Sequence, residues 1–297
     1  MNMDRDAAGP RKRKLKSAGH RPARALIGWM PVPVAYRALV SNRADQEPTE
    51  QQRQLVFTAH RIVEARAEHL DRPCVMSKLP EELQGYRQLL ENNPSAKPFF
   101  LEGWTVGLVN LEKICAFQPI VSIDRAAERV RAASEGSVAR IAEVTLPLRS
   151  TTTLPLTYNE LQRTWSLISS DPNLKVLGPC TMPIPEAGGT PVIGFAVSVP
   201  TSFMQVVELS GRYFLRDGYH RAYGLLAAGI RQVPAFVRSI ESVEQLAPAG
   251  MLPQAAYLGP HPPLLVDYFD DQASTTVLIP AVNKQVIIHA VELDIAA

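Results

Sequence analysis

Residues 211–237 read GRYFLRDGYHRAYGLLAAGIRQVPAFV and contain the pattern that decides the fold. The aromatic and aliphatic side chains of residues 212–216 predict a β-strand. Asp217 and Gly218 predict a tight turn at its end, because glycine takes a positive φ that other residues resist. Residues 220–228 then carry alanine and leucine at helical spacing, so we expect a helix that starts directly after the turn.

The flanking residues extend this pattern on both sides. Gly229 is placed to cap the C-terminus of the helix, and residues 233–238 predict the next strand. Upstream, residues 204–209 predict a strand that Ser210 and Gly211 join to the central strand as a hairpin. The chain should therefore place strand, hairpin turn, strand, helix and strand next to one another in space.

A strand, a glycine turn and a helix in this order can bind an anion. The first free N–H groups of the helix and the positive end of its dipole point at whatever lies over the turn. His220 and Arg221 stand in the first helical turn, where an imidazole can act as acid or base and a guanidinium can bind a phosphate. The alternatives stay open: Asp217 could only stabilise the turn, His220 could cap or pack, and Arg221 could form a surface ion pair. Gly218 is needed under either interpretation.

The motif DGYHR at 217–221, followed by an alanine-rich helix, Gly229 and the sequence VPA at 233–235, resembles the ParB/sulfiredoxin superfamily. Members carry a D-G-x-H-R or G-x-R-R signature, then a similar helix and a strand that opens with VPA. Gln118, followed by proline, resembles the Q-P segment near the start of ParB-like domains. The resemblance covers roughly residues 108–240. It implies an α/β (α+β) domain with a mixed sheet that holds a nucleoside triphosphate at the glycine turn and helix start.

The chain departs from individual branches of that superfamily. Sulfiredoxins carry a cysteine in the corresponding loop, where this chain has Tyr219, so we do not expect peroxiredoxin repair. Chromosome-partition ParB proteins continue into a helix-turn-helix domain, whereas residues 241–297 read as a proline-rich linker and strands. Free-serine kinases share the D-G-x-H-R form and use a glutamate near the start of the domain. Glu102 and Glu112 match that glutamate by rough position only.

The function that the resemblance implies is nucleotide binding, with phosphotransfer or nucleotide hydrolysis and a bound Mg²⁺. His220 and Asp217 are the candidate catalytic residues, and no protein metal motif is expected. The alternative is a non-catalytic, nucleotide-gated or DNA-associated regulatory module, or a scaffold that binds nothing at this turn. Tyr219 could instead pack in the core, and Gln118 could be an amide that stabilises a turn. The candidate nucleotide-binding residues are Gly218, Tyr219, His220, Arg221 and Gln118.

Composition and charge add the partner and compartment predictions. The chain has 297 residues and a formal net charge of +2, but eight of its basic residues lie in residues 1–26 against two aspartates. Only this tail has the charge of a phosphate-backbone binder; it could contact nucleic acid nonspecifically or simply aid solubility. The three cysteines form no CxxC pair, and no apolar run reaches a membrane span of about 20 residues. We expect reduced thiols in the cytoplasm, no membrane partner, and an oligomeric state left open, a homo-oligomer included.

The remaining chain divides into extensions around the central domain. Residues 1–48 are expected to be a basic disordered tail and an extended arm, 49–107 a helical extension, 108–240 the ParB/sulfiredoxin-like domain and 241–297 a C-terminal extension containing strands. The further elements expected are helices at 49–70, 80–91, 124–133 and 157–168, the last opened by a T-x-x-E capping box, and strands at 120–123, 140–148, 175–177, 192–199, 275–279 and 285–293.

Overall fold

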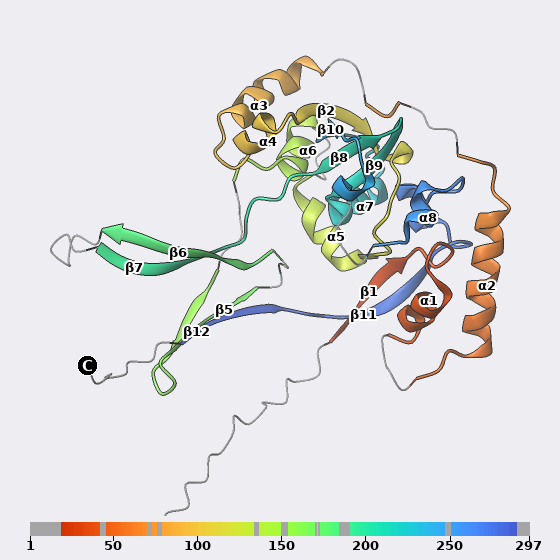
Figure 1. The fold of residues 1–297 in the computed structure, drawn as a ribbon, viewed down its shortest axis with the longest axis horizontal. Helices are drawn as coiled ribbons and strands as arrows, with labels where there is room; N and C mark the ends of the chain where they lie inside the picture. The colour runs from red at the N-terminus through yellow and green to blue at the C-terminus, as the bar shows by residue number, and fades with distance from the viewer. Residues whose placement is uncertain are drawn as a thin grey trace, which may run out of the picture.

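The computed structural model describes residues 19–41, 46–69, 73–75, 79–133, 137–149, 154–169, 171, 173–183, 191–246 and 251–289. It is a mixed α and β structure, which agrees with the predicted class. Figure 1 shows a main body, built from packed helices and sheets, and a pair of β-structures that project from it. We call the projecting part the arm; it comprises the strands within 156–198 together with residues 284–289.

A four-stranded sheet forms the centre of the main body. Its strand order is β2 (Thr105–Asn110), β10 (Gln232–Ser239), β8 (Gln205–Leu209) and β9 (Arg212–Asp217). β10 runs parallel to β8 and antiparallel to β2, so the sheet is mixed. The helix α7 (Tyr219–Ala227) connects β9 to β10. The strand, turn, helix and strand predicted from residues 211–237 are confirmed.

The turns of this unit have the predicted glycine geometry. Ser210 and Gly211 join β8 to β9 with φ values of 53° and 88°, which matches the positive φ of a tight hairpin turn. Gly229 has a φ of 78° and follows α7 directly. Its N–H donates to the carbonyl of Leu226, and the N–H of Ile230 donates to the carbonyl of Leu225, so α7 ends in a Schellman motif.

An aromatic cluster fills the core beside this sheet. Phe236 on β10 is fully buried and stacks on Phe99 with ring centroids 4.9 Å apart. Phe203 packs edge-to-face on both rings, at 5.3 Å from Phe236 and 5.2 Å from Phe99. Phe99 belongs to the short helix α4 (Lys97–Leu101), which therefore anchors the chain upstream of β2. Burial of such rings supplies much of the stability of a domain.

The N-terminal part of the described chain is more ordered than its prolines suggest. β1 (His20–Ala25) lies between β11 (Thr275–Pro280) and β3 (Ile120–Ser122), antiparallel to both. The extended arm expected up to residue 48 is wrong in part, because α1 occupies Val32–Leu39. Its prolines at the N-cap and in the first turn are compatible with a helix, since the N–H groups there have no intrahelical partner.

The two helices predicted within residues 49–107 are confirmed, whereas one predicted strand is wrong. α2 (Glu50–Glu64) begins with the Thr49–Gln52 capping box, and α3 spans Glu81–Glu91. β3 leads directly into α5 (Ile123–Val130), as predicted. The predicted strand 140–148 is instead α6 (Val138–Thr145), where the hydroxyl of Ser137 accepts a hydrogen bond from the N–H of Arg140. The β-branched residues that suggested a strand are buried in α6, and this packing outweighs their weak helix propensity.

The arm is β-structure throughout its described residues, so the predicted helix 157–168 is wrong. β4 (Leu156–Asn159) and β5 (Thr164–Ser169) form a hairpin, and β12 (Lys284–His289) pairs with the other edge of β5. β6 (Lys175–Pro183) and β7 (Pro191–Ser198) form a second, antiparallel hairpin. The T-x-x-E pattern spans the end of β4 and the start of the hairpin turn, where the side chain of Asn159 accepts a hydrogen bond from the N–H of Gln162.

The C-terminal extension pairs with distant parts of the chain. β11 extends the sheet of β1, whereas β12 belongs to the arm, and the last residues of the predicted strand 285–293 lie outside the described residues. Most of the basic tail also lies outside them. No helix in the described parts of the chain has the length and hydrophobicity for crossing a membrane. The remaining elements are η1 (Leu111–Lys113), η2 (Arg131–Ala133), η4 (Val243–Gln245), α8 (Gln254–Leu258) and η5 (Leu265–Phe269).

Candidate anion-binding cleft

A cleft of ≈ 1670 Å³ opens at the turn between β9 and α7. Its walls come from α5, the end of α6, the start of α7, the segment between β7 and β8, and the junction of β5 with β6. Both signs of charge face it, with arginine as the most frequent charged residue. The arginines are Arg125, Arg129, Arg131, Arg149, Arg216 and Arg221, and the carboxylates are Glu128, Glu143, Asp171, Asp217 and Glu244.

Gly218 shapes the turn at the edge of this cleft. Its φ is 105°, and it is the N-cap residue of α7. A Cβ atom at this position would lie 3.1 Å from the Cγ and 3.3 Å from the Cα of Met204, so the backbone has no room for a side chain. Within the described chain, no side chain caps the first N–H groups of α7. Gly218, Tyr219, His220 and Arg221 also line the cleft, so an anion bound there would face the positive end of the helix.

Asp217 and Ser202 form a polar pair beside the turn. The hydroxyl of Ser202 donates a hydrogen bond of 3.0 Å to the Oδ2 atom of Asp217. The side chain of Asp217 is 47% exposed, so part of its carboxylate faces the solvent of the cleft. A carboxylate in this position could bind a hydroxyl group or a metal ion held by a ligand.

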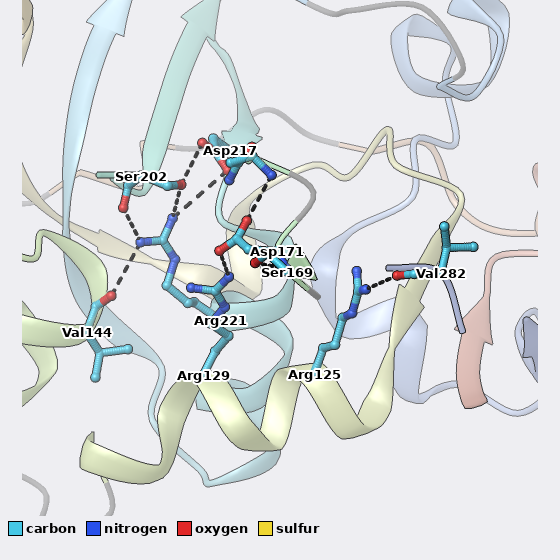
Figure 2. Close-up of polar contacts among 10 residues, drawn as sticks. Arg125, Arg129, Val144, Ser169, Asp171, Ser202, Asp217, Arg221 and Val282 are labelled. Carbon is cyan, nitrogen blue, oxygen red and sulfur yellow. Dashed lines mark hydrogen bonds and ion pairs between the residues drawn. The ribbon is translucent and has the colours of Figure 1, made fainter. Parts of the chain in front are cut away.

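Arg221 is tied into the wall of the cleft. The residue is only 8% exposed, and burial lowers the pKa of its guanidinium to about 10. Its Nη1 atom donates to the carbonyl of Ser202 at 2.6 Å and lies 3.4 Å from the carbonyls of Val144 and Thr145 at the end of α6. Figure 2 shows the guanidinium of Arg221 between Ser202, the carbonyl of Val144 and the side chain of Asp217. A cation here satisfies terminal carbonyls of α6 and opposes the negative end of its dipole, so Arg221 has a structural role.

His220 contacts the start of α5 rather than the groups that hold Arg221. Its Nε2 atom accepts a hydrogen bond of 3.4 Å from the N–H of Ser122. Burial, together with the nearby charges of Arg125 and Arg129, lowers the pKa of His220 from 6.5 to about 4. The imidazole is therefore neutral at pH 7 rather than titrating near it, and its Nδ1–H is a hydrogen-bond donor.

Tyr219 and Gln118 are bonded within the protein. Tyr219 is 4% exposed; its hydroxyl accepts a hydrogen bond of 3.0 Å from the N–H of Phe117, and burial raises its pKa. This geometry fits the packing interpretation. The side-chain amide of Gln118 donates to the carbonyl of Ile120 at 2.7 Å, which fits the turn-stabilising interpretation, although Gln118 also lines the cleft.

The sequence interpretation did not include the charged groups of α5 and of the β5–β6 junction. Arg125 and Arg129 lie one turn apart on α5, and both line the cleft. Arg129 donates a hydrogen bond of 2.6 Å to Asp171, and Arg125 one of 3.2 Å to the carbonyl of Val282, as Figure 2 shows. The i, i+4 spacing of the two arginines on a predicted helix was a signal that could have revealed them.

Glu102 and Glu112, suggested by position alone, lie outside this cleft. Glu112 forms an ion pair of 2.6 Å with Arg231, and Glu102 lies 4.0 Å from Arg238. Neither is among the residues that line the cleft. No protein-family model, curated protein or solved structure matches the chain. The resemblance to the ParB/sulfiredoxin superfamily therefore rests on the residues quoted for it and stays a prediction.

Proposed function

We propose that the cleft binds the phosphates of a nucleoside triphosphate at the Gly218 turn. The observation that carries the proposal is the N-terminus of α7, which no described side chain caps and whose first residues line a cleft with six arginines and five carboxylates. Backbone N–H groups and the helix dipole favour an anion at this place. Because Arg221 is tied to Ser202 and α6, the positive charge for the phosphates would come mainly from α5, where the half-exposed Arg129 lines the cleft.

Magnesium fits this proposal as an ion bound together with the nucleotide. No cluster of three or more metal-ligating side chains occurs in the described chain, so the protein alone would not hold the ion. Mg²⁺ commonly binds through one or two carboxylates and the phosphates of a substrate. The half-exposed Asp217 is the carboxylate nearest the turn and would supply such a ligand. The ion would neutralise phosphate charge when bound.

Two outcomes of binding have to be separated. Phosphotransfer or hydrolysis would need a base or an orienting group, for which Asp217 and His220 are the candidates. The alternative is a regulatory module that binds a nucleotide, or associates with DNA through the basic tail, without turnover. The low pKa of His220 favours the module, because an imidazole with a pKa of about 4 is a weak base at pH 7.

Calorimetric titration with ATP, CTP and GTP in the presence of Mg²⁺ tests the proposal. At least one triphosphate should bind the full chain, and Arg129→Gln should weaken it at least about tenfold, as expected when a charged hydrogen bond is lost. Arg231→Gln is the matched control, since Arg231 pairs with Glu112 outside the cleft and should bind like the wild type. Equal affinity in both variants, or no binding at all, would contradict the proposal.

Release of phosphate, measured in the same samples, distinguishes an enzyme that turns over the nucleotide from a regulatory module that only binds it. An enzyme should show saturable turnover that Asp217→Asn abolishes while nucleotide still binds. Binding without turnover in the wild type supports the regulatory module.

A further inference from the structure

Asp171 places a buried carboxylate against the arginines of the cleft. Its Oδ2 atom lies 2.6 Å from the Nη2 atom of Arg129, as Figure 2 shows. The side chain of Asp171 is 8% exposed, whereas that of Arg129 is 48% exposed. Arg129 therefore contacts the carboxylate and the open cleft at the same time.

The local structure holds Asp171 in this position. The residue lies between β5 and β6, where the arm meets the main body. Its backbone N–H donates to the hydroxyl of Ser169 at 3.0 Å, and its Oδ1 atom accepts from the N–H of Asn173 at 2.9 Å. One carboxylate oxygen thus stabilises the turn, and the other is left to contact Arg129.

The other acids of the cleft are in more polar surroundings. The side chains of Asp217 and Glu143 are 47% and 51% exposed, and Glu143 also pairs with Arg140 at 2.8 Å. Glu128 and Glu244 are exposed as well. Water screens exposed charges strongly, so these four oppose an anion weakly. Asp171 is the carboxylate whose charge an incoming phosphate would feel most.

We propose that Arg129 is a phosphate-binding position of the cleft that Asp171 occupies until a ligand arrives. This inference rests on the proposed function. Carboxylate and phosphate oxygens both accept charge-assisted hydrogen bonds from a guanidinium, so a phosphate oxygen can replace the Oδ2 atom of Asp171 on Arg129. Asp171 then acts as an internal competitor that lowers affinity for phosphate groups. It is a specificity-determining residue, since a ligand without a phosphate at this position gains nothing from displacing it.

The test is calorimetric titration of the full chain with inorganic tripolyphosphate, which has no base or sugar. Asp171→Asn keeps an oxygen that can accept from Asn173 but removes the charge, and it should bind tripolyphosphate about tenfold more tightly than the wild type. Asp171→Ser should show the same gain, and it serves as a second variant if the asparagine protein does not fold.

Two controls make the result specific. Glu143→Gln also removes a negative charge from the cleft wall, but from an exposed and paired side chain, so affinity should change less than about twofold. When Arg129→Gln is already present, Asp171→Asn should raise the logarithm of the tripolyphosphate affinity by less than half as much as it does in the wild type. The reason is that the guanidinium for which Asp171 competes with phosphate is then absent.

Each other outcome decides against the inference. Unchanged or weaker binding by Asp171→Asn, while the wild type binds, would mean that Asp171 orients Arg129 or only stabilises the arm, and the proposed function would stand. An equal gain in Glu143→Gln would mean a general charge effect. If neither the wild type nor the variants bind tripolyphosphate, both the inference and the proposed function fall.

Discussion

The main body and the arm are built from similar residues but differ in how those residues are covered. In the main body, Phe236 is fully buried among three other aromatic rings. In the arm, Phe195 on β7 is 59% exposed, and Leu156 on β4 is also 59% exposed. The candidate site is therefore built on the well-packed part of the molecule, where most residues of α7 are buried. From the arm, the residues around the junction of β5 and β6 line the cleft.

The largest expected effect follows from the two phenylalanines. Phe236→Ala should lower the free energy of unfolding by about 3–5 kcal/mol, because it leaves a cavity in a packed aromatic cluster. Phe195→Ala should cost less than about 1 kcal/mol, since its ring is already mostly in water. Urea denaturation measures both. If both variants lost a similar free energy of unfolding, Phe195 would be covered in solution, and the proposed difference between main body and arm would be wrong.

The second prediction concerns pH and the main body. The pKa of His220 is about 4 in the folded protein and about 6.5 in the unfolded chain, so only the unfolded chain takes up a proton between these values. The free energy of unfolding should therefore fall as pH is lowered from 6.5 to 4, by up to about 3 kcal/mol, and be unaffected by this group at higher pH.

Urea midpoints measured across this pH range check the prediction. His220→Gln should remove most of this slope, and His289→Gln in the arm controls for the loss of one histidine. If His220→Gln kept the full slope, other groups would be responsible for it.

The third prediction concerns a smaller effect, the difference in stability cost when two glycines with positive φ are replaced by alanine. Gly218→Ala should cost about 2 kcal/mol or more, because its φ of 105° strains a side chain and its Cβ would press on the backbone and side chain of Met204. Gly178 in β6 has a φ of 141° but no atom within 4 Å of the added Cβ. Gly178→Ala should therefore cost only the strain, about 1 kcal/mol. Thermal unfolding of the two variants measures these losses of stability. A larger loss for Gly178→Ala than for Gly218→Ala would contradict the prediction.

The sequence was sufficient where the structure depends on local rules. The positive φ of Gly218 and Gly229, the hairpin turn before β9, and the Thr49 capping box all follow from neighbouring residues. The sequence predicted strands at the positions of β6, β7 and β12, but the hairpin of β4 and β5 could not be predicted in this way, because β5 is stabilised by β12, whose residues lie more than 110 positions away in the sequence. In isolation, the T-x-x-E pattern at residue 157 favoured a helix.

In the candidate site, too, local features could be predicted from the sequence and tertiary contacts could not. The glycine turn and helix start follow from the local motif, but the role of Arg221 depends on Ser202 and α6, which only tertiary structure brings to it. His220 was expected to titrate near neutral pH, and the lowered pKa results from burial and from the arginines of α5. Asp171 reaches Arg129 from 42 positions away, so no local pattern indicates the pair.

The central claim is that phosphates bind over the first turn of α7. Two-dimensional NMR of the isotope-labelled full chain during titration with tripolyphosphate and Mg²⁺ tests it directly. The amides of Gly218, Tyr219, His220 and Arg221 should shift in a saturable way, with those of β6 and β7 unchanged. Saturable binding that leaves these four amides unmoved would contradict the account.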